Sequence, residues 1–230
     1  MQVAILETGK PPAPLDARFP GYPAMFADLL GPGFDIVTYD VETGQLPPSP
    51  DAHPAYLVTG SPAGVYEDHA WIKPLKAFLR AAKGKAKIVG ICFGHQIMAE
   101  AFGGKVEKSA HGWRVGLQTY HVDAPPAWMD KVAFYAIPAS HQDQVVVPPS
   151  GARTVARGER GPYGLFAYED QPAISFQAHP EFSAEYAKAL IETRRARLPD
   201  PDAALASLDT PHDGARVGLW IRRFLRDETA

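Results

Sequence analysis

The stretch that decides the fold is residues 87–96, KIVGICFGHQ, which holds the only cysteine of this 230-residue chain. Residues 88–91 are wholly apolar, as expected for a central strand of a parallel sheet whose two faces are both buried. Cys92 follows between Gly90 and Gly94, and apolar side chains then recur at helical spacing. A G-x-C-x-G pattern between a strand and a helix is the nucleophile-elbow pattern with cysteine in place of serine.

Two interpretations of Cys92 follow from its local sequence. A single buried cysteine often packs simply as a small hydrophobic side chain. A nucleophile on a tight turn, however, needs small residues two positions to either side, and Gly90 and Gly94 provide them. The helix that follows would direct its positive N-terminus at the sulfur and favour the thiolate, and the Phe93 amide would lie where an oxyanion forms. These features favour a reactive cysteine.

The elements around this stretch predict the fold class. Strands and helices alternate up to residue 104, which predicts a parallel sheet with helices on both faces. The expected strands are residues 3–6, 34–41, 56–58 and 88–91, and the expected helices begin near Tyr22, Trp71 and Ile97. Beyond residue 104, short runs at 113–121, 145–147, 153–156, 165–168 and 174–177 predict mostly antiparallel strands added to this sheet or beside it. A helix from about Ser183, a loop at 198–214 and a last amphipathic helix at 217–225 complete the chain.

The composition is that of a globular protein, with 46% hydrophobic and 21% charged residues, and the length suits one α/β domain or two small ones. A net charge of −3 without a basic block gives no indication of nucleic-acid binding. The apolar runs are too short to span a membrane, and the N-terminus reads as a strand, not as a signal peptide. One cysteine excludes an internal disulfide, so we expect a cytoplasmic protein.

A cysteine nucleophile also needs a base and a group that orients the base. Among the eight histidines, His179 is the candidate because it follows an apolar strand, and catalytic groups gather at the carboxyl ends of strands in open α/β sheets. Glu181 lies two residues further on, past a proline. Its carboxylate could accept a hydrogen bond from one imidazole nitrogen and leave the other for the thiol. By itself, His-Pro-Glu is also compatible with an ordinary polar loop.

Taken together, four segments resemble the class I glutamine amidotransferase family, especially the amidotransferase part of GMP synthases. GICFGHQ and QAHPEF are similar to the segments that carry the family's Cys-His-Glu triad. Residues 59–68, TGSPAGVYED, resemble its glycine-rich oxyanion loop, and residues 140–145, SHQDQV, resemble the segment whose backbone holds the α-amino and carboxyl end of the substrate. The resemblance implies a flavodoxin-like α/β domain over residues 1–192, with residues 193–230 as a helical extension packed on the same domain.

The resemblance also implies a role for each matching position. Cys92 would be the nucleophile, His179 the general base and then the acid, and Glu181 the orienting carboxylate. Oxyanion-hole amides would come from Ser61 and Phe93, and the substrate-binding residues would be Gly60, Ala63, Gln96, Ser140 and His141. The implied reaction is hydrolysis of the glutamine side-chain amide to glutamate and ammonia through a γ-glutamyl thioester, with no metal or organic cofactor.

Some points stay open in the sequence. The loop reads Gly60-Ser61-Pro62-Ala63 where the family commonly has Gly-Gly-Pro-Gly, so its local backbone would have to differ if either position needed a positive φ. The sequence holds no phosphate-binding loop of a synthetase, so ammonia would pass to a separate synthetase or acceptor subunit, or the protein would act alone on its small-molecule substrate. A γ-glutamyl peptide hydrolase and a non-catalytic regulatory, binding or chaperone protein are the alternatives.

Overall fold

The computed structural model describes residues 1–159 and 161–230. Its centre is a nine-stranded sheet in the order β2-β1-β3-β4-β11-β10-β9-β6-β7, and β5 and β8 form a separate pair. The strands are β1 Gln2–Glu7, β2 Asp35–Asp40, β3 Ala55–Val58, β4 Lys87–Ile91, β5 Lys105–Lys108, β6 Arg114–Val122, β7 Phe134–His141, β8 Asp143–Val147, β9 Ala152–Gly158, β10 Gly161–Tyr168 and β11 Ala173–Phe176. The helices are α1 Tyr22–Leu30, α2 Ile72–Ala82, α3 Phe93–Ala101, α4 Ala184–Arg194, α5 Pro201–Ser207 and α6 Gly214–Arg226.

The sheet has a parallel half and an antiparallel half, as the sequence predicts. Strands β2, β1, β3, β4 and β11 run parallel to one another. Strands β10, β9, β6 and β7 continue the same sheet by antiparallel pairing. Because β4 and β11 are parallel neighbours, their carboxyl ends meet at one edge, and the segments that follow them lie together there.

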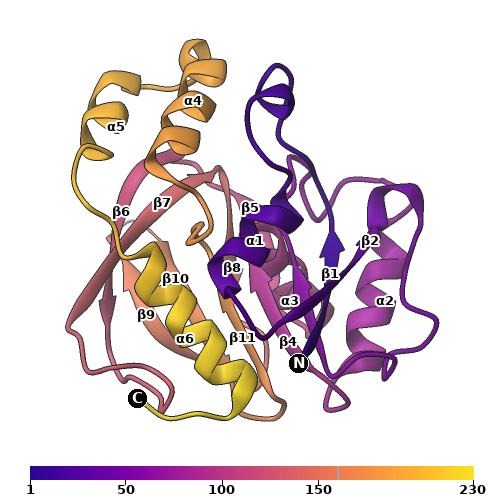
Figure 1. The fold of residues 1–230 in the computed structure, drawn as a ribbon. Helices are drawn as coiled ribbons and strands as arrows, with labels where there is room; N and C mark the ends of the chain where they lie inside the picture. Colours follow the sequence, from indigo (N-terminus) through magenta and orange to yellow (C-terminus); the bar gives the residue numbers. More distant parts are fainter. Residues whose placement is uncertain (160) are drawn as a thin grey trace.

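The two faces of the sheet carry different helices, which the period-two pattern of β1 illustrates. Val3 and Ile5 belong to one buried cluster together with residues of α1, α4 and α6. Ala4 and Leu6 belong to a second cluster with residues of α2 and α3. Figure 1 shows α6 crossing the face of the sheet beside α1. The result is a three-layer α/β arrangement, which confirms the predicted fold class.

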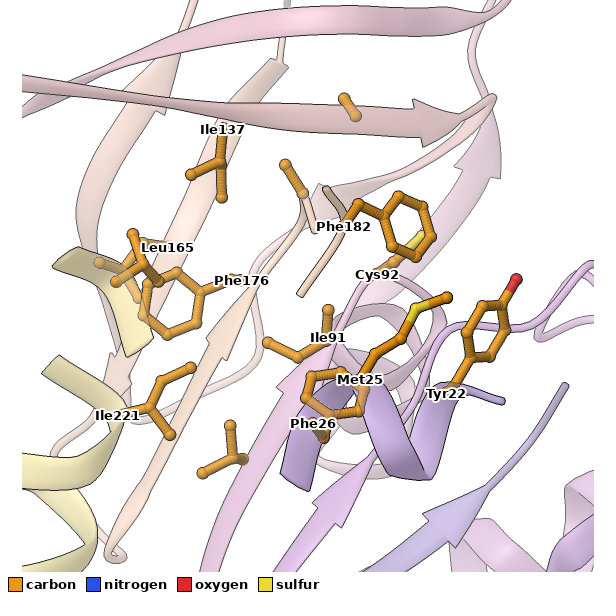
Figure 2. Close-up of a cluster of buried hydrophobic side chains, with 14 of the residues drawn as sticks. Tyr22, Met25, Phe26, Ile91, Cys92, Ile137, Leu165, Phe176, Phe182 and Ile221 are labelled. Atoms are coloured by element: carbon orange, nitrogen blue, oxygen red, sulfur yellow. The ribbon is translucent and has the colours of Figure 1, made fainter. Parts of the chain in front are cut away.

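The last helix, α6, belongs to the core of the domain. Trp220 and Ile221 are fully buried, and the Trp220 ring meets Tyr135 of β7 edge-on with centroids 5.2 Å apart. In Figure 2, Ile221 faces Leu165 and Phe176 of the sheet.

The division of the chain at residue 192 stays a prediction of the sequence. None of the described helices is long and apolar enough to cross a membrane.

Three elements differ from the sequence expectations: β5, which was not expected, β7 and α5. Strand β7 was not expected, since Pro138 lies in its middle. The strand is the outer edge of the sheet, where a residue without an N–H can be accommodated. The expected loop at 198–214 is wrong over α5, which begins after Asp200 because the Asp200 carboxylate accepts a hydrogen bond from the Ala203 amide at 3.0 Å and Pro201 occupies the first helical position.

Candidate active site

Cys92 occupies a strained turn between β4 and α3. Its backbone has φ 54° and ψ −102°, and among the described non-glycine residues only Asp227 shares a positive φ. Such a conformation costs about 1–3 kcal/mol and persists only where the surroundings impose it. The Cys92 amide donates a hydrogen bond to the Phe176 carbonyl at 2.8 Å, which ties the elbow to the end of β11.

The two glycines around Cys92 are required by packing. A Cβ on Gly90 would lie 2.4 Å from Met98 Sδ and 2.6 Å from the Gly94 carbonyl carbon. A Cβ on Gly94 would lie 2.3 Å from the Val58 carbonyl oxygen. These separations are far below van der Waals contact, so the close approach of turn, helix and neighbouring strand needs both glycines, as the elbow pattern predicts.

His179 and Glu181 lie together in the segment that follows β11, close to Cys92. The imidazole Nδ1 donates a hydrogen bond to Glu181 Oε1 at 2.7 Å, and both side chains are almost completely buried. The imidazole stacks on the Phe182 ring with centroids 4.0 Å apart and an interplanar angle of 5°. The His179 amide also donates to the Pro138 carbonyl at 2.8 Å, so β7 fixes the backbone that carries the ring.

Gly60 shows how closely the loop, the cysteine and the histidine approach one another. A Cβ on Gly60 would lie 2.9 Å from His179 Cε1 and 3.8 Å from Cys92 Cβ.

Burial lowers the pKa of His179, but the nearby charges of Cys92 and Glu181 and the hydrogen bonds to both outweigh it and raise this pKa to about 10. The imidazole is therefore held as an imidazolium near neutral pH, between the Cys92 sulfur and the Glu181 carboxylate.

The loop after β3 is fixed against the elbow by backbone hydrogen bonds. The Gly94 amide donates to the Thr59 carbonyl at 3.2 Å, and the Thr8 amide donates to Thr59 Oγ1 at 2.9 Å. Ser61 and Ala63 have no positive φ, so the substitutions in the glycine-rich pattern leave no strained residue. Among the described residues, neither the Ser61 amide nor the Phe93 amide is used in a hydrogen bond, which leaves both available to an oxyanion.

Two cavities meet at Cys92, which lies beside Phe182 at the end of the cluster in Figure 2. We call the larger one the head cavity and the smaller one the tail cavity. The head cavity, about 220 Å³, is lined by four of the residues predicted for substrate binding, Ala63, Gln96, Ser140 and His141, and by Ser61, which is predicted for the oxyanion hole. The tail cavity, about 150 Å³, is lined by Gly60 and His179. Ser61, Pro62, Cys92, Ser140 and Arg194 line both.

Two of the predicted substrate residues are bound to neighbouring protein groups. The Gln96 amide Nε2 donates to the Asp143 carbonyl at 2.8 Å and approaches Gln177 Oε1 at 3.3 Å. His141 donates from Nδ1 to the same carbonyl at 2.9 Å, and burial lowers its pKa to about 4, so the ring is neutral. These contacts hold the Gln96 and His141 side chains in place where they line the head cavity.

Several residues of the site were missed by sequence reasoning. Arg194 at the end of α4 donates to Ser140 Oγ at 2.7 Å and lies over the Trp113 ring, 5.0 Å from its centroid. Lys10 reaches the tail cavity from the loop after β1, and Lys108 reaches the head cavity from β5. No sequence motif marks these cations, because their position depends on how separate loops meet. In the described part of the chain, no three His, Cys, Asp or Glu side chains cluster as metal ligands would.

An elbow cysteine next to a buried His-Glu pair, at the edge where parallel strands end, is an arrangement found in α/β enzymes with a cysteine nucleophile. A family model described as glutamine amidotransferase class-I matches residues 34–195. The chain belongs to the class I glutamine amidotransferase family.

Individual relatives agree with this assignment. The chain is 29% identical over 243 residues to a glutamine amidotransferase-like protein of Schizosaccharomyces pombe, covering 97% of this chain and 98% of that one. It is 29% identical over 180 residues to gamma-glutamyl peptidase 2 of Arabidopsis thaliana, covering 75% and 72%. A glutamine amidotransferase of Thermotoga maritima has the same fold, with a TM-score of 0.77, 17% identity and 98% of both chains covered.

Proposed function

We propose that the protein hydrolyses the side-chain amide of a γ-glutamyl compound, with glutamine as the simplest substrate and glutamate as one product. The observation that carries the proposal is the arrangement of Cys92 on the elbow next to a buried His179–Glu181 pair with a 2.7 Å hydrogen bond. A silent binding protein would not need an imidazole held between a cysteine and a carboxylate. The arrangement therefore favours an enzyme over the non-catalytic alternative.

The proposed chemistry has two acyl-transfer steps. The Cys92 thiolate attacks the γ-carbonyl carbon, and the oxyanion that forms accepts hydrogen bonds from the Ser61 and Phe93 amides. The C–N bond then breaks as His179 donates a proton to the departing nitrogen, which leaves a γ-glutamyl thioester on Cys92. Water, deprotonated by His179, attacks the thioester, releases glutamate and regenerates the thiol, while Glu181 keeps the ring oriented throughout.

The departing amine distinguishes two forms of this function. Release of ammonia makes the protein a glutaminase, and a separate synthetase subunit could then use the ammonia. Release of a larger amine makes it a γ-glutamyl peptide hydrolase, which is what the name of the Arabidopsis relative describes for that protein. The space beside His179 supports this second form, because the tail cavity, about 150 Å³ in all, is lined by both Cys92 and His179.

The direct test is an assay of glutamate release from glutamine and from γ-glutamyl dipeptides, with Cys92→Ala as the control. We expect glutamate release by the wild-type protein and its loss in the variant. Glutamate release that persists in Cys92→Ala would contradict the mechanism, and the absence of release from every γ-glutamyl compound would contradict the function.

A further inference from the structure

The two cavities at Cys92 can be assigned to the two ends of a γ-glutamyl substrate by the position of the proton donor. Cleavage requires His179 to protonate the departing nitrogen, and His179 is among the described residues that line the tail cavity and not the head cavity. The departing amine must then extend into the tail cavity. The γ-glutamyl group occupies the head cavity, beside Gln96 and His141.

The two cavities also differ in the charges of the side chains that line them. The head cavity carries both signs, with Lys108, Arg194 and Arg197 as cations and Glu67 and Asp143 as carboxylates, which suits the ammonium and carboxylate of a γ-glutamyl head. The tail cavity carries Lys10 and shares Arg194 with the head cavity, and no carboxylate is found among its described lining residues. A tail built in this way is complementary to an anion.

Arg194 lies at the boundary of the two cavities and is the cation through which the tail cavity would bind such an anion. Its guanidinium donates to the neutral Ser140 hydroxyl and stacks on Trp113, and no carboxylate of the described chain forms an ion pair with it. A guanidinium has five N–H donors, so N–H groups remain that can donate hydrogen bonds to a ligand carboxylate. Lys10 is partly neutralised, since its ammonium also binds Asp40 at 2.7 Å.

The rest of the tail cavity is apolar or aromatic. Tyr22 of α1 and Phe182 and Leu190 around α4 form its inner wall, and all three are buried. The Tyr22 hydroxyl is already paired with the Tyr186 hydroxyl at 3.1 Å, so this wall presents mainly carbon to a ligand. Ammonia would leave this wall and both cations without a contact.

We propose that the tail cavity binds the leaving amine, and that this amine carries both a carboxylate and an apolar side chain, so that the substrates are γ-glutamyl derivatives of apolar amino acids. The inference rests on the proposed hydrolysis of a γ-glutamyl amide. Arg194 and Lys10 select the carboxylate, and the Tyr22, Phe182 and Leu190 wall accepts the side chain.

Three substrates with the same head separate these contributions: glutamine, γ-glutamyl-leucine and γ-glutamyl-isopentylamide, which keeps the leucine side chain and lacks its carboxylate. A hydrogen-bonded charge pair contributes roughly tenfold to hundredfold, so we expect kcat/KM for γ-glutamyl-leucine to exceed that for the isopentylamide by at least about tenfold. We expect Arg194→Gln to bring this ratio close to one and Lys10→Gln to lower it in part. Because the ratio is taken within each variant, a loss of folded protein does not affect it.

Lys83→Gln is the matched control, since Lys83 also forms an ion pair with an aspartate, Asp170, but lies toward the amino ends of β4 and β11, at the opposite edge from Cys92. Its ratio should equal that of the wild type. Equal cleavage of the leucine and isopentyl compounds, or cleavage of glutamine alone, would overturn the inference and leave the hydrolytic function standing. Cleavage of none of the three would overturn the function, and the inference with it.

Discussion

Replacing Gly60 by alanine tests whether the position of the His179 ring controls the reaction. The new methyl carbon would lie 2.9 Å from His179 Cε1, whereas ordinary contact begins at 3.4 Å, so the two atoms must separate by 3.4 − 2.9 = 0.5 Å. The ring cannot retreat easily, because the Phe182 ring stacks on it with centroids 4.0 Å apart. Gly60 has no positive φ, so alanine introduces no backbone strain of its own.

The expected result is a selective loss of turnover. A misplacement of about 1 Å in an active site can lower a rate about 10²-fold, so a shift of half that size should lower kcat about tenfold. Stability should fall by only about 1–3 kcal/mol, as for a typical overpacked site, and the protein stays folded. The assay is kcat for glutamate release from a γ-glutamyl substrate, together with the midpoint of urea unfolding.

Gly21→Ala is the matched control for this prediction. A Cβ at Gly21 would meet its nearest neighbour, Pro23 Cδ, at an ordinary 3.7 Å, and we expect kcat to stay at the wild-type value. Unchanged kcat in folded Gly60→Ala would refute the reasoning, because the clash with the imidazole could then be relieved without consequence for catalysis.

Further predictions concern the proton donor and the packing. Burial lowers the pKa of His179, but the charges of Cys92 and Glu181 outweigh it and raise this pKa to about 10. Because Glu181→Gln removes one of the charges that stabilise the imidazolium, it should move the alkaline limb of the kcat/KM profile to lower pH. Gly94→Ala should destabilise the fold by about 3 kcal/mol in urea unfolding, because its Cβ would lie 2.3 Å from the backbone oxygen of Val58. Trp220→Ala should cost about 3–5 kcal/mol in the same measurement, since this fully buried ring anchors α6.

Each of these predictions has a clear contrary result. An alkaline limb that does not move in Glu181→Gln would mean that the carboxylate does not control the His179 proton. A Gly94→Ala protein as stable as the wild type would mean that the turn and β3 can separate at no cost. Wild-type stability of Trp220→Ala would mean that α6 contributes little to the core.

The sequence predicted the parallel half of the sheet well, because β1, β3, β4 and β11 are buried on both faces and their apolar runs are nearly continuous, whereas the edge strand β2 has no fully buried residue. Residues 88–91 and 174–177 are examples, and β4 and β11 occur there as adjacent parallel strands. Strand β7 escaped prediction because it is an edge strand that contains Pro138 and is only partly apolar. Helix α5 could have been found, since Asp200 followed by Pro201 is a helix-start signal.

The candidate site shows the same division between local and distant information. The elbow is local, and its glycines and the helix after it can be read directly from the sequence around Cys92. The pairing of His179 with Glu181 is also local, two residues apart, and the structure has the expected hydrogen bond. The positions of Lys10 and Arg194 could not be predicted, because they depend on how the loop after β1 and the end of α4 fold over the elbow.

The central claim is that Cys92 carries a γ-glutamyl thioester during turnover. Mixing the protein with a γ-glutamyl substrate, quenching rapidly in acid and measuring the intact mass and its peptides tests this claim directly. We expect an added mass of one γ-glutamyl group on the peptide that contains Cys92, formed before steady state and absent in Cys92→Ala. Turnover without any acylated Cys92 at the shortest times, or acylation of the Cys92→Ala protein at another residue, would contradict the account.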